Sequence, residues 1–209
     1  MTVENVPWMT QGGIHSASSG RRVLFKATSG AEGVDAISDM RVTQKAVAIG
    51  KVAVAAGGFT AVNRYPGIKG ESYGGYVLTP TDVDIAANGG GSTRYDLVIA
   101  RIDDWNFPGG QATPTGLPRD DVPVTKLTVI QGVASTVKKA SELGLNYPAV
   151  ALARIALPAG TSAVTNAMIT DLRNLTNPRR QRFVRTRAIT AAELETLTSA
   201  TGEQWPNVA

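Results

Sequence analysis

The stretch YDLVIARIDD at residues 95–104 decides the fold, together with the stretch AVALARIAL at residues 149–157. Both are rich in aliphatic and β-branched residues, both place apolar side chains on either side of an extended chain, and both end in turn-forming residues. This pattern is typical of strands that are covered on both faces. We predict that the two stretches lie side by side inside a β core.

Working outward from these strands, the chain repeats short extended segments separated by turn residues. Strands are expected at residues 41–44, at 46–54 with Gly50 as a bulge, and at 59–62, 76–79, 83–85, 124–131 and 168–173, with a loop at 64–75 and one helical turn at 140–143. Strands this short indicate antiparallel pairing rather than alternating strand–helix units. We therefore predict a mainly β protein whose domain, residues 41–175, is an antiparallel β-sandwich or is barrel-like.

The two ends of the chain are expected to differ from this domain. Residues 1–40 are predicted to form an N-terminal arm with a short helix at 21–28, which follows a serine cap and ends before Gly30. Trp8 is a candidate anchor of the arm on a neighbouring subunit, and a surface arm is the alternative. Residues 176–209 are predicted to form a tail with an Arg-rich segment and a short helix.

The C-terminal helix is predicted from its start signal. Thr190 and Glu193 have the spacing of a capping box, and Ile189 and Leu194 have the spacing of the accompanying hydrophobic staple. These signals indicate a helix over about residues 191–200. A helix this short is marginal alone, so we expect it to dock on its own domain or on another subunit.

Composition limits the classes that are open to this chain of 209 residues. Hydrophobic residues make up 43%, enough for one domain with tails, and 22 glycines fit a turn-rich β protein. The chain has no cysteine, which excludes disulfides, Cys-ligated metals and thiol nucleophiles and fits a reducing compartment. The first residues do not resemble a signal peptide, and no apolar run approaches the roughly 20 residues of a membrane span. We expect no membrane insertion.

Residue patterns for catalysis and metal binding are weak. His15 is the only histidine, which excludes a multi-histidine metal site, and no Gly-x-Ser-x-Gly turn supports a triad that uses it. The acidic pairs at 103–104 and 120–121 lack the spacing of a calcium loop and are typical of turns. We expect no cofactor and no enzyme activity.

Charged residues inside the two deciding strands need partners, because an unpaired buried charge is costly. Asp96 and Arg101 belong to the first strand and Arg154 to the second. Asp171 and Arg173 follow the second strand closely. We predict a structural ion-pair network in which Arg154 and the Asp171/Arg173 pair are the partners of Asp96 and Arg101.

Much of the positive excess behind the net charge of +4 lies at residues 178–187, which contain five arginines. Such a run suits phosphate backbones, but its only aromatic residue is Phe183 and no nucleic-acid fold signature surrounds it. We therefore favour a protein interface or a solvated edge strand and expect no nucleic acid. The candidate assembly-interface residues are Trp8, Arg179, Arg180, Arg182, Phe183, Arg185, Arg187, Ile189, Leu194 and Leu197.

Aromatic residues in predicted loops leave a second function open. Trp105, Phe107 and Tyr147 are of the residue type that stacks on sugars, as is Tyr73 in the predicted 64–75 loop. These rings are candidates for contact with a host cell-surface glycan. The alternative, which we favour, is that they cover the ends of the sandwich.

Several segments, taken in order, resemble minor tail proteins and tail-fibre or baseplate appendage proteins of siphophages, especially those that infect actinobacteria. They are PW at 7–8, HSA at 15–17, AEGV at 31–34, DMRVT at 39–43, the strand and glycine turn at 47–57, RYDLVIARIDD at 94–104, ALARI and PAG within 151–160, and ITDLR at 169–173. The resemblance covers roughly residues 7–175. Its most specific parts are the DLVIARIDD and ITDLR runs in this order.

The resemblance implies a non-enzymatic virion component of the tail tip, made in the host cytoplasm and mostly β in structure. It also implies copies arranged as a trimer or hexamer in contact with other tail proteins. Longer relatives carry a large C-terminal shaft or adhesin domain. Its absence from this sequence favours an adaptor or collar whose terminal segments grip neighbouring subunits.

Overall fold

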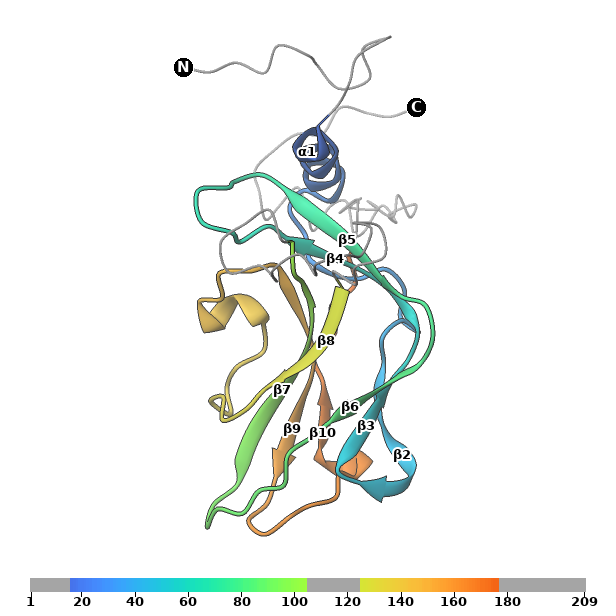
Figure 1. Cartoon of the computed structure of the whole chain (residues 1–209), viewed down its shortest axis with the longest axis vertical. Helices are drawn as coiled ribbons and strands as arrows, with labels where there is room; N and C mark the ends of the chain where they lie inside the picture. The colour runs from blue at the N-terminus through green and yellow to red at the C-terminus, as the bar shows by residue number, and fades with distance from the viewer. Residues whose placement is uncertain (1–15, 105–124, 177–209) are drawn as a thin grey trace, which may run out of the picture. The chain divides into compact units, whose positions relative to one another are not determined.

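The computed structural model describes residues 16–104 and 125–176, and these form a mainly β structure (Figure 1). Within them lie one α-helix, α1 (Ala17–Thr28), and three antiparallel sheets without a closed barrel. The first sheet has the order β1 (Gly33–Val34), β4 (Gly57–Val62), β5 (Ser72–Val77). The second has the order β2 (Val42–Ile49), β3 (Lys51–Val54), β6 (Thr81–Asp84). The third has the order β10 (Ile169–Asp171), β9 (Ala149–Leu157), β7 (Arg94–Ile102), β8 (Thr125–Ile130).

The two stretches that decide the fold are neighbouring strands, as predicted. β7 pairs with β9 in antiparallel register, with Leu97 opposite Arg154 and Val98 opposite Ala153. The register then shifts, so that Ile99 lies opposite Ala151 and Leu152 has no partner on β7. The extra residue is a β-bulge, which bends the strand locally.

Strand β7 is covered on both faces because its alternate side chains enter two different hydrophobic clusters. Val98, Ala100 and Ile102 belong to a core shared with residues of all three sheets. Leu97 and Ile99 belong to a smaller cluster with residues of the 133–149 segment. Successive side chains along a strand point to opposite faces of the sheet. Because both faces of β7 are covered by apolar clusters, residues 97–100 form an uninterrupted apolar run.

The first two sheets are two halves of one long, bent ribbon. Val54 of β3 lies opposite Thr81 of β6, and shortly beyond, Gly57 of β4 lies opposite Val77 of β5. The ribbon changes sheet at residues 55–56 and 78–80, where Pro80 has no N–H to continue the pairing. All three sheets contribute to one core, an arrangement compatible with the expected sandwich.

Two predicted segments have different structures. Gly50 is not a bulge inside one strand. It lies between β2 and β3, where Ile49 pairs with Lys51, and a Cβ at this position would lie 3.2 Å from the Ser162 carbonyl oxygen and 3.3 Å from that of Ile85. The loop predicted at 64–75 is also too long, because β5 already begins at Ser72.

The paired glycines that suggested this loop lie within strand β5. A Cβ at Gly75 would lie 2.5 Å from the ring of Phe59, and a Cβ at Gly74 would lie 3.8 Å from Leu24 of α1. The 3.8 Å at Gly74 is ordinary van der Waals contact, whereas the 2.5 Å at Gly75 leaves no room for a side chain, a close approach that glycine inside a strand often marks. Tyr73 consequently lies in a strand and not in a loop.

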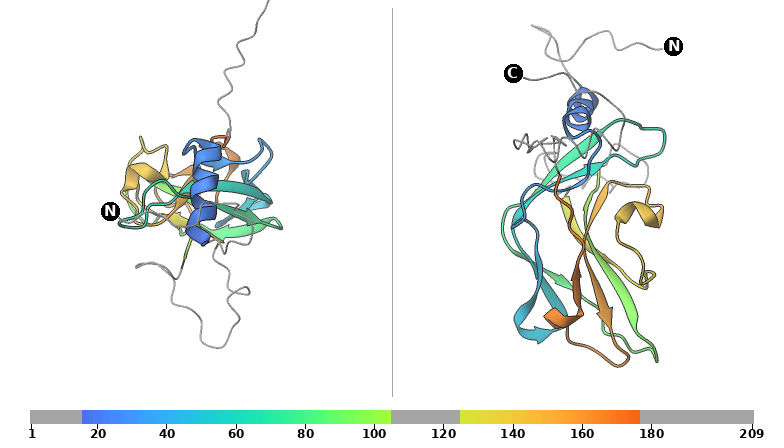
Figure 2. Two further views of the ribbon diagram at one scale, coloured as in Figure 1. Left: turned by 90° about the horizontal axis from the view of Figure 1, so that it is seen from above. Right: turned by 180° about the vertical axis from the view of Figure 1, so that it is seen from behind.

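Helix α1 begins earlier than predicted and packs on the β domain. The hydroxyl of Ser16 accepts a hydrogen bond from the Ser19 N–H (3.2 Å), and the helix ends at Ser29, which has a left-handed backbone. Figure 2 shows α1 lying across β4 and β5. Strand β1, also in the segment assigned to the arm, pairs with β4. The described part of residues 1–40 is therefore attached to the sheets of its own chain.

The shorter predicted elements around β9 are also present. A 3₁₀ turn at Ala140–Leu143 ends at Gly144, whose φ of 63° is in the left-handed region. A second 3₁₀ turn, Asn166–Met168, leads into β10. The predicted C-terminal helix and the first 15 residues lie outside the described residues.

Candidate functional site

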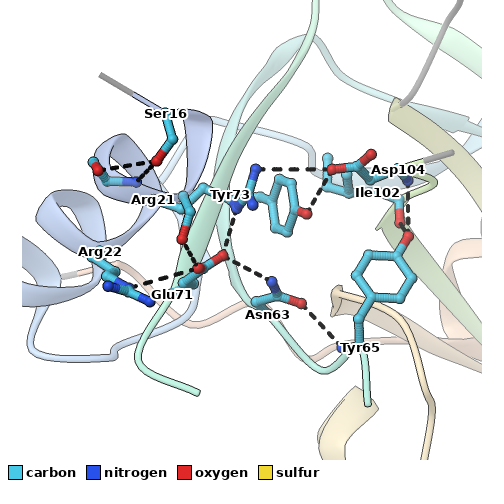
Figure 3. Close-up of polar contacts among 11 residues, drawn as sticks. Ser16, Arg21, Arg22, Asn63, Tyr65, Glu71, Tyr73, Ile102 and Asp104 are labelled. Carbon is cyan, nitrogen blue, oxygen red and sulfur yellow. Dashed lines mark hydrogen bonds and ion pairs between the residues drawn. The ribbon is translucent and has the colours of Figure 1, made fainter. Parts of the chain in front are cut away.

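A buried carboxylate, Glu71, joins α1 to the β4–β5 hairpin (Figure 3). Only 1% of Glu71 is exposed. One of its oxygens accepts a hydrogen bond from the Ser18 hydroxyl, and the other accepts one from Arg21 Nε at 2.6 Å. Ser18 and Arg21 lie three residues apart, on the same face of the helix. The first turns of α1 therefore carry the groups that bind this carboxylate.

The hairpin itself contributes to the same cluster. Asn63 Nδ2 donates to Glu71 at 3.2 Å, and the Asn63 N–H donates to the backbone carbonyl of Glu71 at 2.8 Å. Arg22 Nε lies 3.8 Å from the carboxylate. Glu71, which binds the helix, therefore also joins the two ends of the connection between β4 and β5, residues 63–71.

The contacts of Glu71 determine its pKa. Burial alone would raise the pKa of Glu71. The hydrogen bonds from Ser18, Arg21 and Asn63 and the charge of Arg21 outweigh burial and lower the pKa.

A second carboxylate, Asp104, extends the cluster toward the end of β7. Its Oδ2 accepts a hydrogen bond from the Tyr73 hydroxyl at 2.8 Å and lies 3.9 Å from Arg21 NH1. The Tyr65 hydroxyl donates to the Ile102 carbonyl and accepts from the Asp104 N–H, at 2.9 and 2.8 Å. Burial and the bond to Asp104 raise the pKa of Tyr73, so its hydroxyl stays protonated. We call Ser18, Arg21, Asn63, Tyr65, Glu71, Tyr73 and Asp104 the Glu71 cluster.

The Glu71 cluster is suited to holding elements together. Glu71 is enclosed on all sides, and Arg21 contacts both carboxylates and lies 5.0 Å from the centre of the Tyr73 ring. A substrate in solution cannot reach a carboxylate that is 1% exposed. The cluster therefore fixes α1, and with it the point where residue 16 enters the domain.

Sequence reasoning did not identify the Glu71 cluster. Glu71 lies in the segment where the sequence predicts a loop, and its partner Arg21 lies 50 positions earlier in the chain. No local spacing connects two residues so far apart. The only available signal was a single acidic residue among glycines, tyrosines and turn residues at 64–75.

The predicted ion-pair residues are paired, but with different partners. Asp96, fully buried, accepts two hydrogen bonds from Arg94, both at 2.8 Å, and one from the Gly132 N–H at 3.1 Å. Arg101 Nε donates to Asp103 at 2.6 Å. Arg154 is not their partner: it donates to the Val137 carbonyl at 3.1 Å.

Asp171 and Arg173, predicted as partners of Asp96 and Arg101, bind each other instead. Asp171 binds Arg173, whose Nε and NH2 lie 2.9 and 2.7 Å from its two oxygens, and these bonds lower the pKa of Asp171 despite its partial burial. Arg173 also donates to the carbonyls of Ile37 and Asp39. All three pairs join residues i and i+2, which share one face of an extended chain. The Asp171/Arg173 pair was named from the sequence, and the same spacing is the signal for the two pairs that were missed, Arg94–Asp96 and Arg101–Asp103.

The sugar-contact candidates are only partly described. The ring of Tyr147 is half-buried, and the Arg101 guanidinium lies 4.0 Å from its centre, so a cation already occupies one face of the ring. Trp105 and Phe107 lie outside the described residues. All the assembly-interface candidates lie outside them as well: Trp8, Arg179, Arg180, Arg182, Phe183, Arg185, Arg187, Ile189, Leu194 and Leu197.

Other features of the described residues give no sign of a bound small ligand. A groove of about 250 Å³ between β2 and β10 has a mixed lining that includes Arg41 and Asp171. Residues 16–104 and 125–176 contain no group of three His, Cys, Asp or Glu side chains placed to hold a metal ion. In the same part of the chain, no helix has the length and hydrophobicity that crossing a bilayer requires.

The comparisons with known proteins leave the chain without an identified relative. No family model, no curated protein and no solved structure matched this sequence or its fold.

Proposed function

We propose that this chain is a structural protein of a phage tail tip, a minor tail, baseplate or fibre-adaptor protein that acts through protein–protein assembly. One observation carries the proposal: the segments that resemble siphophage tail proteins are structural elements of one domain. RYDLVIARIDD supplies β7, ALARI supplies β9 and ITDLR supplies β10, three neighbouring strands of one sheet. The resemblance therefore concerns a folded framework and not a set of reactive groups.

The surface of the described domain supports a role in assembly. Several large apolar side chains are exposed, including Val47 at 74%, Ile37 at 80% and Leu78 at 88%. Exposed apolar groups that gather into patches are typical of interaction sites. In this proposal the β-sandwich-like domain is repeated as a trimer or hexamer in the virion, and the segments before residue 16 and after residue 176 bind neighbouring tail proteins.

The test is incorporation into particles. A variant that lacks residues 178–209 is produced during infection by the phage that carries the gene, and purified particles are analysed by immunoblot. We expect the variant to unfold at a temperature close to that of the full chain, because β1–β10 are intact, and to be absent from particles. A matched control replaces residues 178–209 with a Gly/Ser-rich segment of equal length. Particles that contain the truncated protein at the normal level would contradict the proposal.

A further inference from the structure

Three large apolar side chains are exposed around Gly57 and Gly58 of β4. Tyr76, which is 67% exposed, lies directly opposite Gly58 in the β4–β5 pair. Leu78, which is 88% exposed, follows Val77, the residue opposite Gly57. Ile37, 80% exposed, lies in the turn that joins β1 to β2 and runs beside the same two glycines. We call Ile37, Tyr76 and Leu78, with Asp35 and Asp39, the Tyr76 patch.

The absence of side chains at the two glycines makes room for three members of the patch, Asp35, Asp39 and Tyr76. A Cβ at Gly58 would lie 2.2 Å from Asp35 Oδ2 and 2.8 Å from the ring of Tyr76. Asp39 accepts a hydrogen bond from the Gly58 N–H at 3.1 Å. The Tyr76 ring and the Asp35 carboxylate therefore lie beside each other over the backbone of β4, on the outer side of the ribbon.

The patch carries negative charge that its surroundings do not neutralise. Neither Asp35 nor Asp39 forms an ion pair with another of the described residues. Burial and the charge of Asp39 raise the pKa of Asp35, although a hydrogen bond with Thr60 opposes the rise. The Arg173 guanidinium donates to the backbone carbonyls of Ile37 and Asp39 but is bound to the carboxylate of Asp171. A partner that brings cations and an apolar group would relieve both the repulsion and the apolar exposure.

We propose that the Tyr76 patch binds residues 182–187 of a second copy of this chain. The sequence there is RFVRTR, and in an extended chain Phe183, Arg185 and Arg187 point to the same side. One aromatic ring with two cations complements the exposed Tyr76 ring with its two carboxylates. The proposal rests on the assembly role proposed above and names the surface that receives the Arg-rich segment.

The absence of cysteine from the chain allows a clean cross-linking test with the full-length protein. Ser38→Cys, at an exposed position between Ile37 and Asp39, and a tagged Val184→Cys variant are mixed, oxidised, and separated on a non-reducing gel. Ser38→Cys leaves the Tyr76 ring and both carboxylates in place. The control pairs Val47→Cys, on β2 and 74% exposed, with the same Val184→Cys variant. If the segment binds the patch, the Ser38→Cys heterodimer forms at least about tenfold faster than the control, because docking raises the effective concentration of the two thiols.

A charge variant tests the basis of the contact. Adding Asp35→Asn and Asp39→Asn to Ser38→Cys should remove most of the tenfold advantage, provided that its melting temperature matches that of Ser38→Cys alone. Equal rates for the Ser38 and Val47 pairs would overturn the proposal. So would a product dominated by Ser38→Cys homodimers, or a Ser38→Cys/Val184→Cys double variant that closes only within one chain.

The two proposals fail in different ways. If particles require residues 178–209 but Ser38→Cys shows no preferred link, the assembly role stands and this surface is wrong. If the link forms but particles accept the truncated protein, the contact exists and the proposed function of the tail is wrong.

Discussion

The β7–β9 pair and the α1–β5 contact are held together by different forces. In β7 four consecutive residues, Leu97 to Ala100, are completely buried, and the strand is stabilised by apolar packing on both faces. At α1 the closest contacts are polar and converge on one carboxylate, Glu71. Packing is spread over many side chains, whereas the helix depends on a few directional bonds. Damage to the first region should therefore unfold the whole domain, and damage to the second should release one element.

The largest effect is expected from a cavity in the first region. Leu152→Ala removes most of a side chain that is completely buried at the β9 bulge. Substitutions of this kind cost about 2–5 kcal/mol of unfolding free energy. Urea denaturation should show one cooperative transition at a lower midpoint. Leu78→Ala, the same change at a residue that is 88% exposed, is the control and should leave the midpoint almost unchanged. Equal shifts in the two variants would contradict the description of β9 as a core strand.

The second prediction concerns the helix contact. Glu71→Gln keeps the shape of the side chain but removes the charge that Arg21 and Ser18 bind. We expect a loss of about 1–3 kcal/mol, the usual cost of removing hydrogen bonds to a charged group. Hydrogen exchange should show faster exchange in α1 while β7 and β9 remain protected. The control is Glu142→Gln, at an exposed position. Uniformly faster exchange in all strands would show that the contact is not local.

The pH dependence of the helix contact follows from the lowered pKa of Glu71. A carboxyl group whose pKa is lower in the folded state stabilises the fold fully above its unfolded pKa, ordinarily 4.5, and this contribution disappears as the pH falls through the folded pKa. The stability difference between the native chain and Glu71→Gln should therefore be constant at neutral pH and shrink in acid. A difference that grew as the pH fell would mean that the pKa is raised. The comparison uses two otherwise identical chains, so other titrating groups such as Asp35 and Asp171 largely cancel.

The contrast between the two regions also explains what could be predicted from the sequence. β7 and β9 can be located from the sequence because apolar runs are local properties. Strands covered on both faces lie in the interior of a sheet, where they are natural neighbours. Arg94–Asp96 and Asp171–Arg173 are also local, at i and i+2. The prediction for Asp96 nevertheless named the distant Arg154 and the Asp171/Arg173 pair, and the nearby Arg94 is its actual partner.

The features that were missed depend on contacts between distant segments. The glycines at 74–75 have turn composition, and only the approach of the Phe59 ring shows why the strand needs glycine at position 75. Glu71 and Arg21 are unremarkable until α1 is placed on β5. Sequence patterns therefore indicated the framework, whereas the Glu71 cluster and the Tyr76 patch required the structure.

The smallest effect is expected at a pair whose geometry matches that of the helix contact. Lys45 Nζ lies 2.7 Å from Asp82, almost the same as the 2.6 Å from Arg21 Nε to Glu71. The side chains of Lys45 and Asp82 are 34% and 42% exposed, whereas those of Arg21 and Glu71 are 16% and 2% exposed. Water and salt screen the exposed pair, so Lys45→Ala should change the unfolding free energy by only about 0–1 kcal/mol. Repeating the measurement in high salt should further reduce the effect of Lys45→Ala but leave most of the effect of Glu71→Gln. Equal losses in both variants would mean that distance, and not burial, decides the strength of these contacts.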